Sequence, residues 1–291
     1  MKILDVLHTT TYRYSRQVVL EPHRLMLRPR ASHDLRLIST QLSCSPPATV
    51  SWVYDVFGNS IAMATFADMA NTLTIESRIK LELFASAWPV FQVAASAHSY
   101  PFDYSLDERI DLGMMIVPQY PDPDGRLLSW ARAFVRGSVT DTLSLLKDMN
   151  EGITGWISYQ SRDDEGTQAP LETLDRGFGS CRDIALLMIE AVRHLGFGAR
   201  IVSGYLHNPL NEDKGSAASG STHAWVEIYL PGAGWISFDP TNRKVGGSNL
   251  IPVAVARDIK QAVPISGSFV GATSDFLGMS VSVVVTNGAA D

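Results

Sequence analysis

Cysteine is scarce in this chain of 291 residues, which contains only Cys44 and Cys181. Two cysteines in distant segments are not the pattern of a small domain stabilised by disulfides, so Cys44 is interpreted as a passive thiol. The sequence also has no CxxC, HExxH or EF-hand pattern. We therefore predict no metal site and no bound cofactor.

Long apolar runs and basic blocks are absent too. No stretch approaches the roughly 18 uncharged apolar residues of a membrane span, and the start, MKILDVLHTTTYRYS, lacks the apolar segment of a signal peptide. The net charge is −6 and no basic block stands out, which disfavours nucleic acid as a partner. The sequence thus predicts a cytoplasmic protein that binds neither nucleic acid nor membrane.

Cys181 lies at the predicted start of a helix. Ser180 is a good N-cap residue, and Asp183 stands three residues later, where the capping box usually has Glu or Gln. Apolar residues then recur at helical spacing until Gly196. In a first turn, the helix dipole and free backbone N–H groups favour a thiolate and suit a developing oxyanion. A small buried thiol at a helix start is the alternative interpretation.

A predicted β-hairpin carries a histidine and an aspartate on one face. Within residues 222–230 and 235–239, even-numbered apolar residues alternate with an odd-numbered set that includes His223 and Asp239. A four-residue loop pairing 230 with 235 would put the two side chains on opposite faces, because a slip of one residue reverses a strand. We therefore predict an odd-numbered loop or a bulge, with His223 and Asp239 nearly diagonal. A structural histidine and a turn aspartate are the alternatives.

Cys181, His223 and Asp239 together provide a thiol nucleophile, its base and a carboxylate that orients the base. The backbone N–H of Cys181 is one candidate donor to an oxyanion. A second donor is sought upstream among Trp156, Tyr159 and Gln168, of which Tyr159 is favoured. Trp225 is predicted to line the substrate cleft or, equally, to serve packing. Arg182 and Asp183 either adjust the electrostatic field at the Cys181 thiol or cap the N-terminus of the helix. For Asp183 the capping role is favoured.

The first 90 residues are predicted to form a β-sandwich. Alternating or β-rich runs are separated by turn signals such as Ser45-Pro-Pro and Phe57-Gly-Asn. The expected strands are 2–14, 18–28, 35–44, 49–56, 60–67 and 72–84.

Residues 91–124 are interpreted as an irregular linker packed on the surface, and 125–291 as a core domain with a strand-rich tail. The expected core elements are helices at about 125–136, about 141–156 and from Cys181, with strands near 199–206, 222–230, 235–239 and 281–285. Two loops, 160–179 and 207–220, flank the candidate residues. The second loop is either a mobile lid or a passive surface loop.

Three segments carry a family resemblance: GFGSCRD (177–183), RHLGFGARIVSGY (193–205) and THAWVEIYLPGAGWISFDPT (222–241). In this order they resemble the transglutaminase-like superfamily, specifically bacterial transglutaminase-like cysteine proteases, over about residues 140–245. HTTTYRYS (8–15) and HRLMLRPR (23–30) are similar to the β-rich region that precedes this core in many bacterial members.

The resemblance implies an α+β fold, with a papain-like transglutaminase core behind an N-terminal β-sandwich. It implies Cys181 as nucleophile, His223 as base and Asp239 as the orienting carboxylate. The expected partner is a peptide or protein amide substrate. The superfamily includes peptidases, amidases, deamidases and crosslinking enzymes, so the substrate stays open at this point.

Acyl transfer through a thioester is the expected chemistry, and water or an amine can complete it. Hydrolysis is favoured, because a crosslinking enzyme must shield the thioester from water and no calcium-rich or large accessory region is present. A protein-glutamine transglutaminase or deamidase with the same three residues is the alternative. Two other classes remain: a non-catalytic peptide-binding module, and a zinc site formed by Cys181, His207 and His223.

Overall fold

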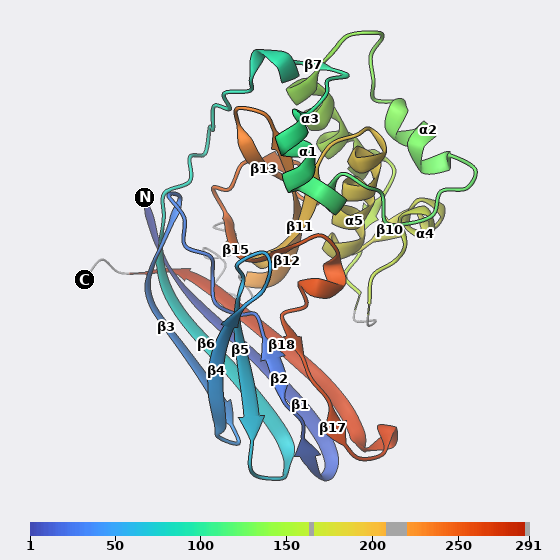
Figure 1. The fold of residues 1–291 in the computed structure, drawn as a ribbon. Coiled ribbons are helices and arrows are strands. Elements are labelled where there is room, and N and C mark those ends of the chain that lie inside the picture. Colours follow the sequence, from blue (N-terminus) through green and yellow to red (C-terminus); the bar gives the residue numbers. More distant parts are fainter. Residues whose placement is uncertain (163–165, 208–219, 289–291) are drawn as a thin grey trace.

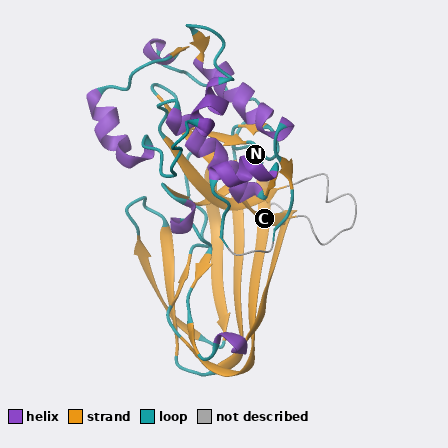
Figure 2. Cartoon of the chain, turned by 90° about the vertical axis from the view of Figure 1, so that its right-hand side faces the viewer, coloured by secondary structure: helices purple, strands orange, loops and turns teal. Residues whose placement is uncertain are grey.

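A computed structural model describes residues 1–162, 166–207 and 220–288. The molecule has a strand-rich half and a helix-rich half, which are the lower and upper parts of Figure 1. Figure 2 shows long strands running from one half toward the other, with most of the helices gathered at one end.

The N-terminal strands form two facing sheets, as the alternating sequence predicts. In β6, Leu73, Ile75 and Leu81 are fully buried, and they are separated by even numbers of residues, so they lie on the same face of the strand. One sheet contains β1, β6 and β3, and the other contains β2, β5 and β4. The predicted strands 2–14 and 18–28 differ in detail, because β1 continues to Leu20 and β2 is short. The strands are β1 (Lys2–Leu20), β2 (His23–Leu25), β3 (Leu35–Ser45), β4 (Ala48–Tyr54), β5 (Ser60–Phe66) and β6 (Ala70–Leu83).

The end of the chain returns to this β-rich half. β18 (Phe276–Asn287) contains the predicted strand and runs antiparallel to β1, from Leu4 opposite Asn287 to Tyr14 opposite Phe276. β16 (Ile265–Ser266) pairs with β2, and β17 (Phe269–Val270) pairs with β1. The sequence-based boundary groups 125–291 as a core with a strand-rich tail and does not say where the tail packs. Alternation identifies a strand but not its partner, which lies more than 250 residues away along the chain.

Five α-helices occur in the described part of the chain, and three of them were predicted. α1 lies inside the predicted irregular linker, where Ser105 and Glu108 form a capping box. α4 lies inside the predicted loop 160–179 and begins with Pro170. Few of their residues are buried, Leu112 in α1 and Pro170 and Thr173 in α4, so neither shows buried apolar residues at helical spacing. The helices are α1 (Leu106–Leu112), α2 (Arg126–Arg132), α3 (Thr142–Gly152), α4 (Pro170–Arg176) and α5 (Cys181–His194).

α5 packs against the antiparallel strands of the helix-rich half. Ile184 and Leu187 on the helix and Val226, Ile228 and Phe238 on the strands are fully buried in one cluster. A single sheet runs β14-β13-β12-β18-β1-β6-β3, and β12 meets β18 at Gly220 opposite Val283. The two halves therefore share one continuous sheet. Its core strands are β11 (Ala199–His207), β12 (Gly220–Leu230), β13 (Gly234–Asp239), β14 (Lys244–Val245) and β15 (Leu250–Ala256).

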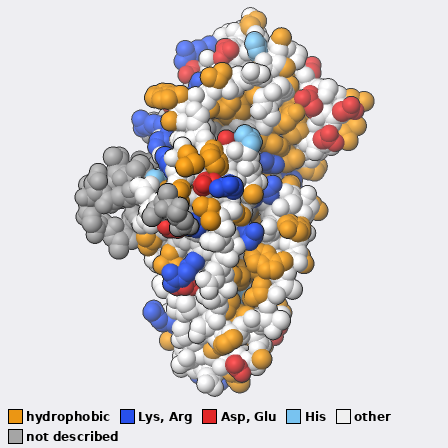
Figure 3. Space-filling view, turned by 90° about the vertical axis from the view of Figure 1, so that its left-hand side faces the viewer, with side chains coloured by type: hydrophobic (Ala, Val, Ile, Leu, Met, Phe, Trp, Pro, Cys, Tyr) orange, Lys and Arg blue, Asp and Glu red, His pale blue; other side chains and the backbone are white. Residues whose placement is uncertain are grey.

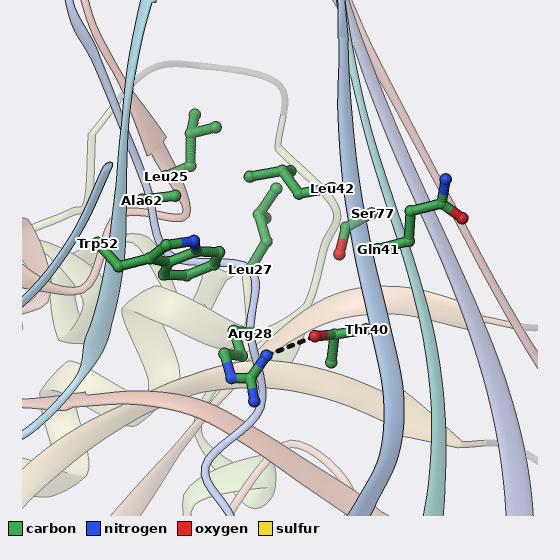
Figure 4. Close-up of a pocket in the computed structure, with 9 residues that line it drawn as sticks. All are labelled: Leu25, Leu27, Arg28, Thr40, Gln41, Leu42, Trp52, Ala62 and Ser77. Atoms are coloured by element: carbon green, nitrogen blue, oxygen red, sulfur yellow. Dashed lines mark hydrogen bonds between the residues drawn. The ribbon is translucent and has the colours of Figure 1, made fainter. Parts of the chain in front are cut away.

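A small pocket lies between the two sheets of the β-rich half (Figure 4). Leu25, Leu27, Leu42 and the Trp52 ring form its apolar walls, and Arg28 donates a hydrogen bond to Thr40 at one end. None of its lining residues belongs to α5, β12 or β13. This pocket is therefore separate from the predicted site.

On the face drawn in Figure 3, acidic and basic side chains lie in small groups among hydrophobic ones. Among the described residues, no helix combines the length and the apolar character that crossing a membrane requires. The cytoplasmic location stays a prediction. Most of the loop 207–220, for which the sequence leaves a lid and a passive surface loop open, lies outside the described residues.

Candidate active site

Cys181 is the first residue of α5, as predicted. Asp183 caps the helix: its Oδ2 accepts hydrogen bonds from the backbone N–H and the hydroxyl of Ser180, both at 2.8 Å. Gly179 leaves room for this cap, since a Cβ there would lie 2.8 Å from the Asp183 side chain. The free N–H groups of the first turn are thus held beside the thiol.

The predicted hairpin register is confirmed. Leu230 pairs with Gly234 across a three-residue loop, and Val226 pairs with Phe238. The odd loop places His223 and Asp239 on one face, where His223 Nε2 lies 2.9 Å from Asp239 Oδ2. Only 5% of His223 and 1% of Asp239 are exposed. This contact therefore forms in a site from which water is largely excluded.

Cys181, His223 and Asp239, hereafter the candidate triad, lie in one hydrogen-bonded chain. Burial by itself lowers the pKa of His223, but hydrogen bonds to Asp239 and Cys181 raise that pKa to about 10. Burial raises the pKa of the Cys181 thiol, while the hydrogen bond with His223, its charge and the backbone N–H of Ala224 bring the pKa below its usual value. Both directions favour a thiolate–imidazolium pair.

Asn242 is a further member of the site that the sequence reasoning missed. Its Nδ2 donates to Asp239 Oδ2 at 2.7 Å and lies 3.4 Å from His223 Nε2. Its backbone N–H donates to Asp239 Oδ1 at 3.2 Å. Both carboxylate oxygens are thereby fixed. An aspartate followed three residues later by asparagine in a Pro-containing turn was the available signal.

Asp183 makes more contacts than its predicted capping role requires. Besides Ser180, it accepts hydrogen bonds from Arg162 Nε at 3.0 Å and from the backbone N–H of Gln168 at 2.8 Å. Asp183 is fully buried, and these bonds hold its pKa below the usual range against the opposing effect of burial. The start of α5 is thus tied to the segment that leads into α4.

Tyr159 lies beside the thiol, but its role as oxyanion donor stays a prediction. The short strands β9 (Ser158–Tyr159) and β10 (Phe178–Gly179) run parallel and pair Tyr159 with Gly179. Burial raises the pKa of Tyr159, and the charge of nearby Cys181 raises it further. Tyr159 is 57% exposed. Trp156 is also exposed, whereas the Gln168 side chain is buried and accepts a hydrogen bond from Thr173.

Trp225 lies behind the imidazole and is only 1% exposed. Its ring faces that of His223, with centroids 6.1 Å apart and an angle of 25° between the planes. Gly204 makes this possible, because a Cβ there would lie 2.8 Å from the indole and 2.1 Å from the Ile251 carbonyl oxygen. The buried position of Trp225 agrees with the packing role that the sequence allowed. Its alternative role, lining the substrate cleft, stays a prediction.

Nothing in the described ranges resembles a metal centre. No three His, Cys, Asp or Glu side chains there are arranged so that they could hold a metal ion, so Cys181, His207 and His223 of the zinc alternative do not form such a group. Cys181 and Cys44 are both free. Burial raises the pKa of Cys44, opposite to the shift at Cys181.

A cysteine at a helix start, packed against a hairpin that carries histidine and aspartate, is the arrangement of a papain-like α+β fold. Residues 129–240 match the model of the transglutaminase-like superfamily, and residues 4–82 match the bacterial transglutaminase-like N-terminal region. The chain therefore has a core of the transglutaminase-like superfamily, preceded by a bacterial transglutaminase-like N-terminal region.

Several known proteins are similar to this chain. An uncharacterized protein of Mycobacterium tuberculosis is 27% identical over 98% of this chain and 93% of its own length. The solved structure of a proposed cysteine protease from Cytophaga hutchinsonii aligns over 100% of this chain and 93% of its own, with a TM-score of 0.74 and 18% identity. A protein-glutamine gamma-glutamyltransferase of Pseudomonas aeruginosa is 32% identical over 31% of this chain and 13% of its own length.

Proposed function

We propose that this protein is a cysteine-dependent hydrolase of peptide or protein amide bonds that acts through a thioester. The observation that carries the proposal is the hydrogen-bonded chain from Cys181 to His223 to Asp239, with 2.9 Å between His223 Nε2 and Asp239 Oδ2. The similarity to a proposed cysteine protease supports the same class.

The chemistry follows from the arrangement. The Cys181 thiolate attacks the amide carbonyl carbon, and the tetrahedral oxyanion is held by backbone N–H groups at the start of α5. The His223 imidazolium gives its proton to the leaving amine, the C–N bond breaks, and an acyl-thioester forms. Water, deprotonated by His223, then attacks the thioester. The carboxylic acid leaves and the thiolate–imidazolium pair is restored.

Asp239 and Asn242 act on the imidazole from the other side. Asp239 accepts a hydrogen bond from the Nε2–H of His223, which leaves Nδ1 directed to the thiol and stabilises the imidazolium. Asn242 donates to the same carboxylate oxygen, so this oxygen is held in place for the imidazole. In this scheme the carboxylate stays ionised throughout.

The first experiment measures alkylation of Cys181 by iodoacetamide against pH, with each cysteine assigned by mass spectrometry. We expect a reactive plateau well below pH 8.5 in the wild type, lost in His223→Ala, because the imidazolium stabilises the thiolate. Cys44 in the same samples is the internal control and should follow an ordinary or raised profile. An ordinary Cys181 profile that the substitution leaves unchanged would favour the non-catalytic peptide-binding module.

Transglutaminase activity is the second candidate function, supported by the similarity to a protein-glutamine gamma-glutamyltransferase. The same thioester forms in both reactions, and an amine then replaces water as the attacking group. Hydrolysis and transfer are distinguished by incubating the enzyme with a glutamine-containing peptide and a primary amine. The products are then identified by mass spectrometry. Carboxylic acid as the main product supports hydrolysis, and a stable amide of the added amine supports transfer.

A further inference from the structure

The N-terminal half contacts the core directly behind the candidate triad. The β4–β5 loop (55–59) reaches the face of the core sheet that also carries His223. Phe57 packs against the buried cluster formed by Val202, Trp225, Leu250 and Val255. These four residues come from β11, β12 and β15, so a side chain of the N-terminal half packs against a cluster drawn from three core strands.

Trp225 connects this patch to the imidazole. It stands two residues beyond His223 on the same face of β12, and the two rings face each other. The buried indole Nε1 has no hydrogen-bond partner among the described residues. Apolar packing within this cluster therefore holds the ring in place, and Phe57 packs against the same cluster.

The loop is fastened to the core by a buried amide. Asn59 Oδ1 accepts from the backbone N–H of Val255 at 2.9 Å, and Asn59 Nδ2 donates to the carbonyl oxygen of Val255 at 2.7 Å. Asn59 is fully buried. Arg30 Nη1 donates to the carbonyl oxygen of Phe57 at 3.1 Å and to Asn59 Oδ1 at 2.7 Å. Removing this amide would leave buried backbone groups without partners, so the contact is specific.

Asp55 shapes the loop for this contact. Its Oδ1 accepts hydrogen bonds from the backbone N–H groups of Phe57 and Asn59, both at 2.9 Å, and its Oδ2 accepts from Asn59 Nδ2 at 2.8 Å. Val56, the neighbour of Phe57, points the other way and is 93% exposed. The same loop therefore provides both a contacting side chain and a matched control.

We propose that the N-terminal half is a positioning domain for the active site, in which Phe57 and Asn59 hold Trp225 and thereby the orientation of the His223 ring. The proposal rests on the proposed function of the candidate triad. An imidazole that serves both a thiol and a carboxylate must keep its ring plane, and small misplacements of reacting groups cost large factors in rate. Phe57 and Asn59 touch no reacting atom, so they are positioning residues.

The test compares Phe57→Ala with Val56→Ala in the full chain. Cys181 alkylation is followed against pH, kcat and KM are measured on a cleaved amide, and thermal unfolding is recorded for each variant. We expect Phe57→Ala to move the alkylation profile toward that of an ordinary thiol and to lower kcat about 10-fold with KM nearly unchanged. Val56→Ala should match the wild type in every readout.

Phe57→Leu keeps part of the apolar contact and serves where Phe57→Ala does not fold. It should shift the profile in the same direction by a smaller amount. A Phe57 variant that unfolds at lower temperature but keeps the wild-type alkylation profile would overturn the proposal, because Phe57 would then serve packing alone. If the wild type itself lacks the plateau below pH 8.5, the proposed function fails instead.

Discussion

Two buried histidines in this molecule are held in opposite protonation states. His8 on β1 is 1% exposed, and its ring nitrogens lie 3.0 Å from the Tyr205 hydroxyl and 2.9 Å from Thr10 Oγ1. His223 on β12 is nearly as buried, but its partners are Asp239 and Cys181. Burial lowers the pKa of His8 to about 4, whereas the pKa of His223 rises to about 10 despite burial.

The difference teaches that burial alone does not determine the charge of an imidazole. Hydroxyl partners satisfy the ring nitrogens of His8 without offering a countercharge, so desolvation prevails and the ring stays neutral. At His223 an ionised carboxylate on one side and a thiolate on the other outweigh the same cost. Hydroxyl partners thus suit a structural histidine, and ionisable partners suit one that handles protons.

The largest expected effect is the loss of His223. His223→Ala removes both the base and the partner of the thiolate, so turnover should fall by about 10⁴-fold or more. His8→Gln keeps polar groups toward Tyr205 and Thr10 and should leave turnover unchanged. Steady-state kinetics on one amide substrate compares the two variants. Equal losses in both would remove the distinction between the two histidines.

Asp239→Asn weakens the site without removing its base. The substitution replaces the carboxylate that raises the pKa of His223, so this pKa should fall from about 10 and the imidazolium should lose its proton at lower pH. We expect kcat to fall by about 10²- to 10⁴-fold with a smaller change in KM. pH–rate profiles of the variant and the wild type are the measurement. Unchanged turnover would exclude Asp239 from the triad.

Asn242→Ala tests the hydrogen bond behind the carboxylate. Asp239 then loses the donor at 2.7 Å from its Oδ2, while the contact with His223 remains possible. We expect kcat to fall about 10-fold, because one charge-assisted hydrogen bond contributes roughly 1.5–3 kcal/mol and part of it acts on orientation. Asn242→Asp places a second carboxylate beside the first and should disturb the pH profile more. Profiles identical to the wild type would contradict a role for Asn242.

The smallest effect concerns His8 and stability alone. Its pKa is about 4 in the folded protein and about 6.5 when unfolded, so its contribution is complete above pH 6.5 and is lost as the pH falls toward 4. The loss amounts to about 3 kcal/mol. Denaturant unfolding between pH 7 and pH 4 should show this decrease in the wild type, reduced in His8→Gln. Parallel curves would show that His8 is not the group responsible.

Local patterns were sufficient for most of the site. Ser180 and Asp183 marked the start of α5, and the two-residue alternation around His223 and Asp239 required an odd loop, which the structure contains. The sequence did not identify Asn242, because its role depends on a turn that places its amide against the Asp239 carboxylate. The sequence did not identify Arg162 either, because its partner Asp183 is 21 residues away along the chain.

The arrangement of the two halves was beyond local patterns. The alternation in 281–285 identified a strand, but only the folded chain shows that β18 pairs with β1 and that β12 meets β18 at one residue pair. The contact of Phe57 with the cluster around Trp225 likewise has no signal in the sequence. Such contacts join residues far apart in the chain, so neither periodicity nor spacing encodes them.

By itself the sequence determined the helix that presents Cys181 and the shared face of His223 and Asp239, because helix caps and strand alternation act over a few residues. The α+β class followed from the resemblance of three sequence segments to a known superfamily. Tertiary structure decided the rest: that three distant segments meet, that Asn242 completes the site, and that the N-terminal half lies behind the imidazole. The protonation states also belong to the tertiary structure, because the pKa of a histidine depends on the groups that the fold places around it.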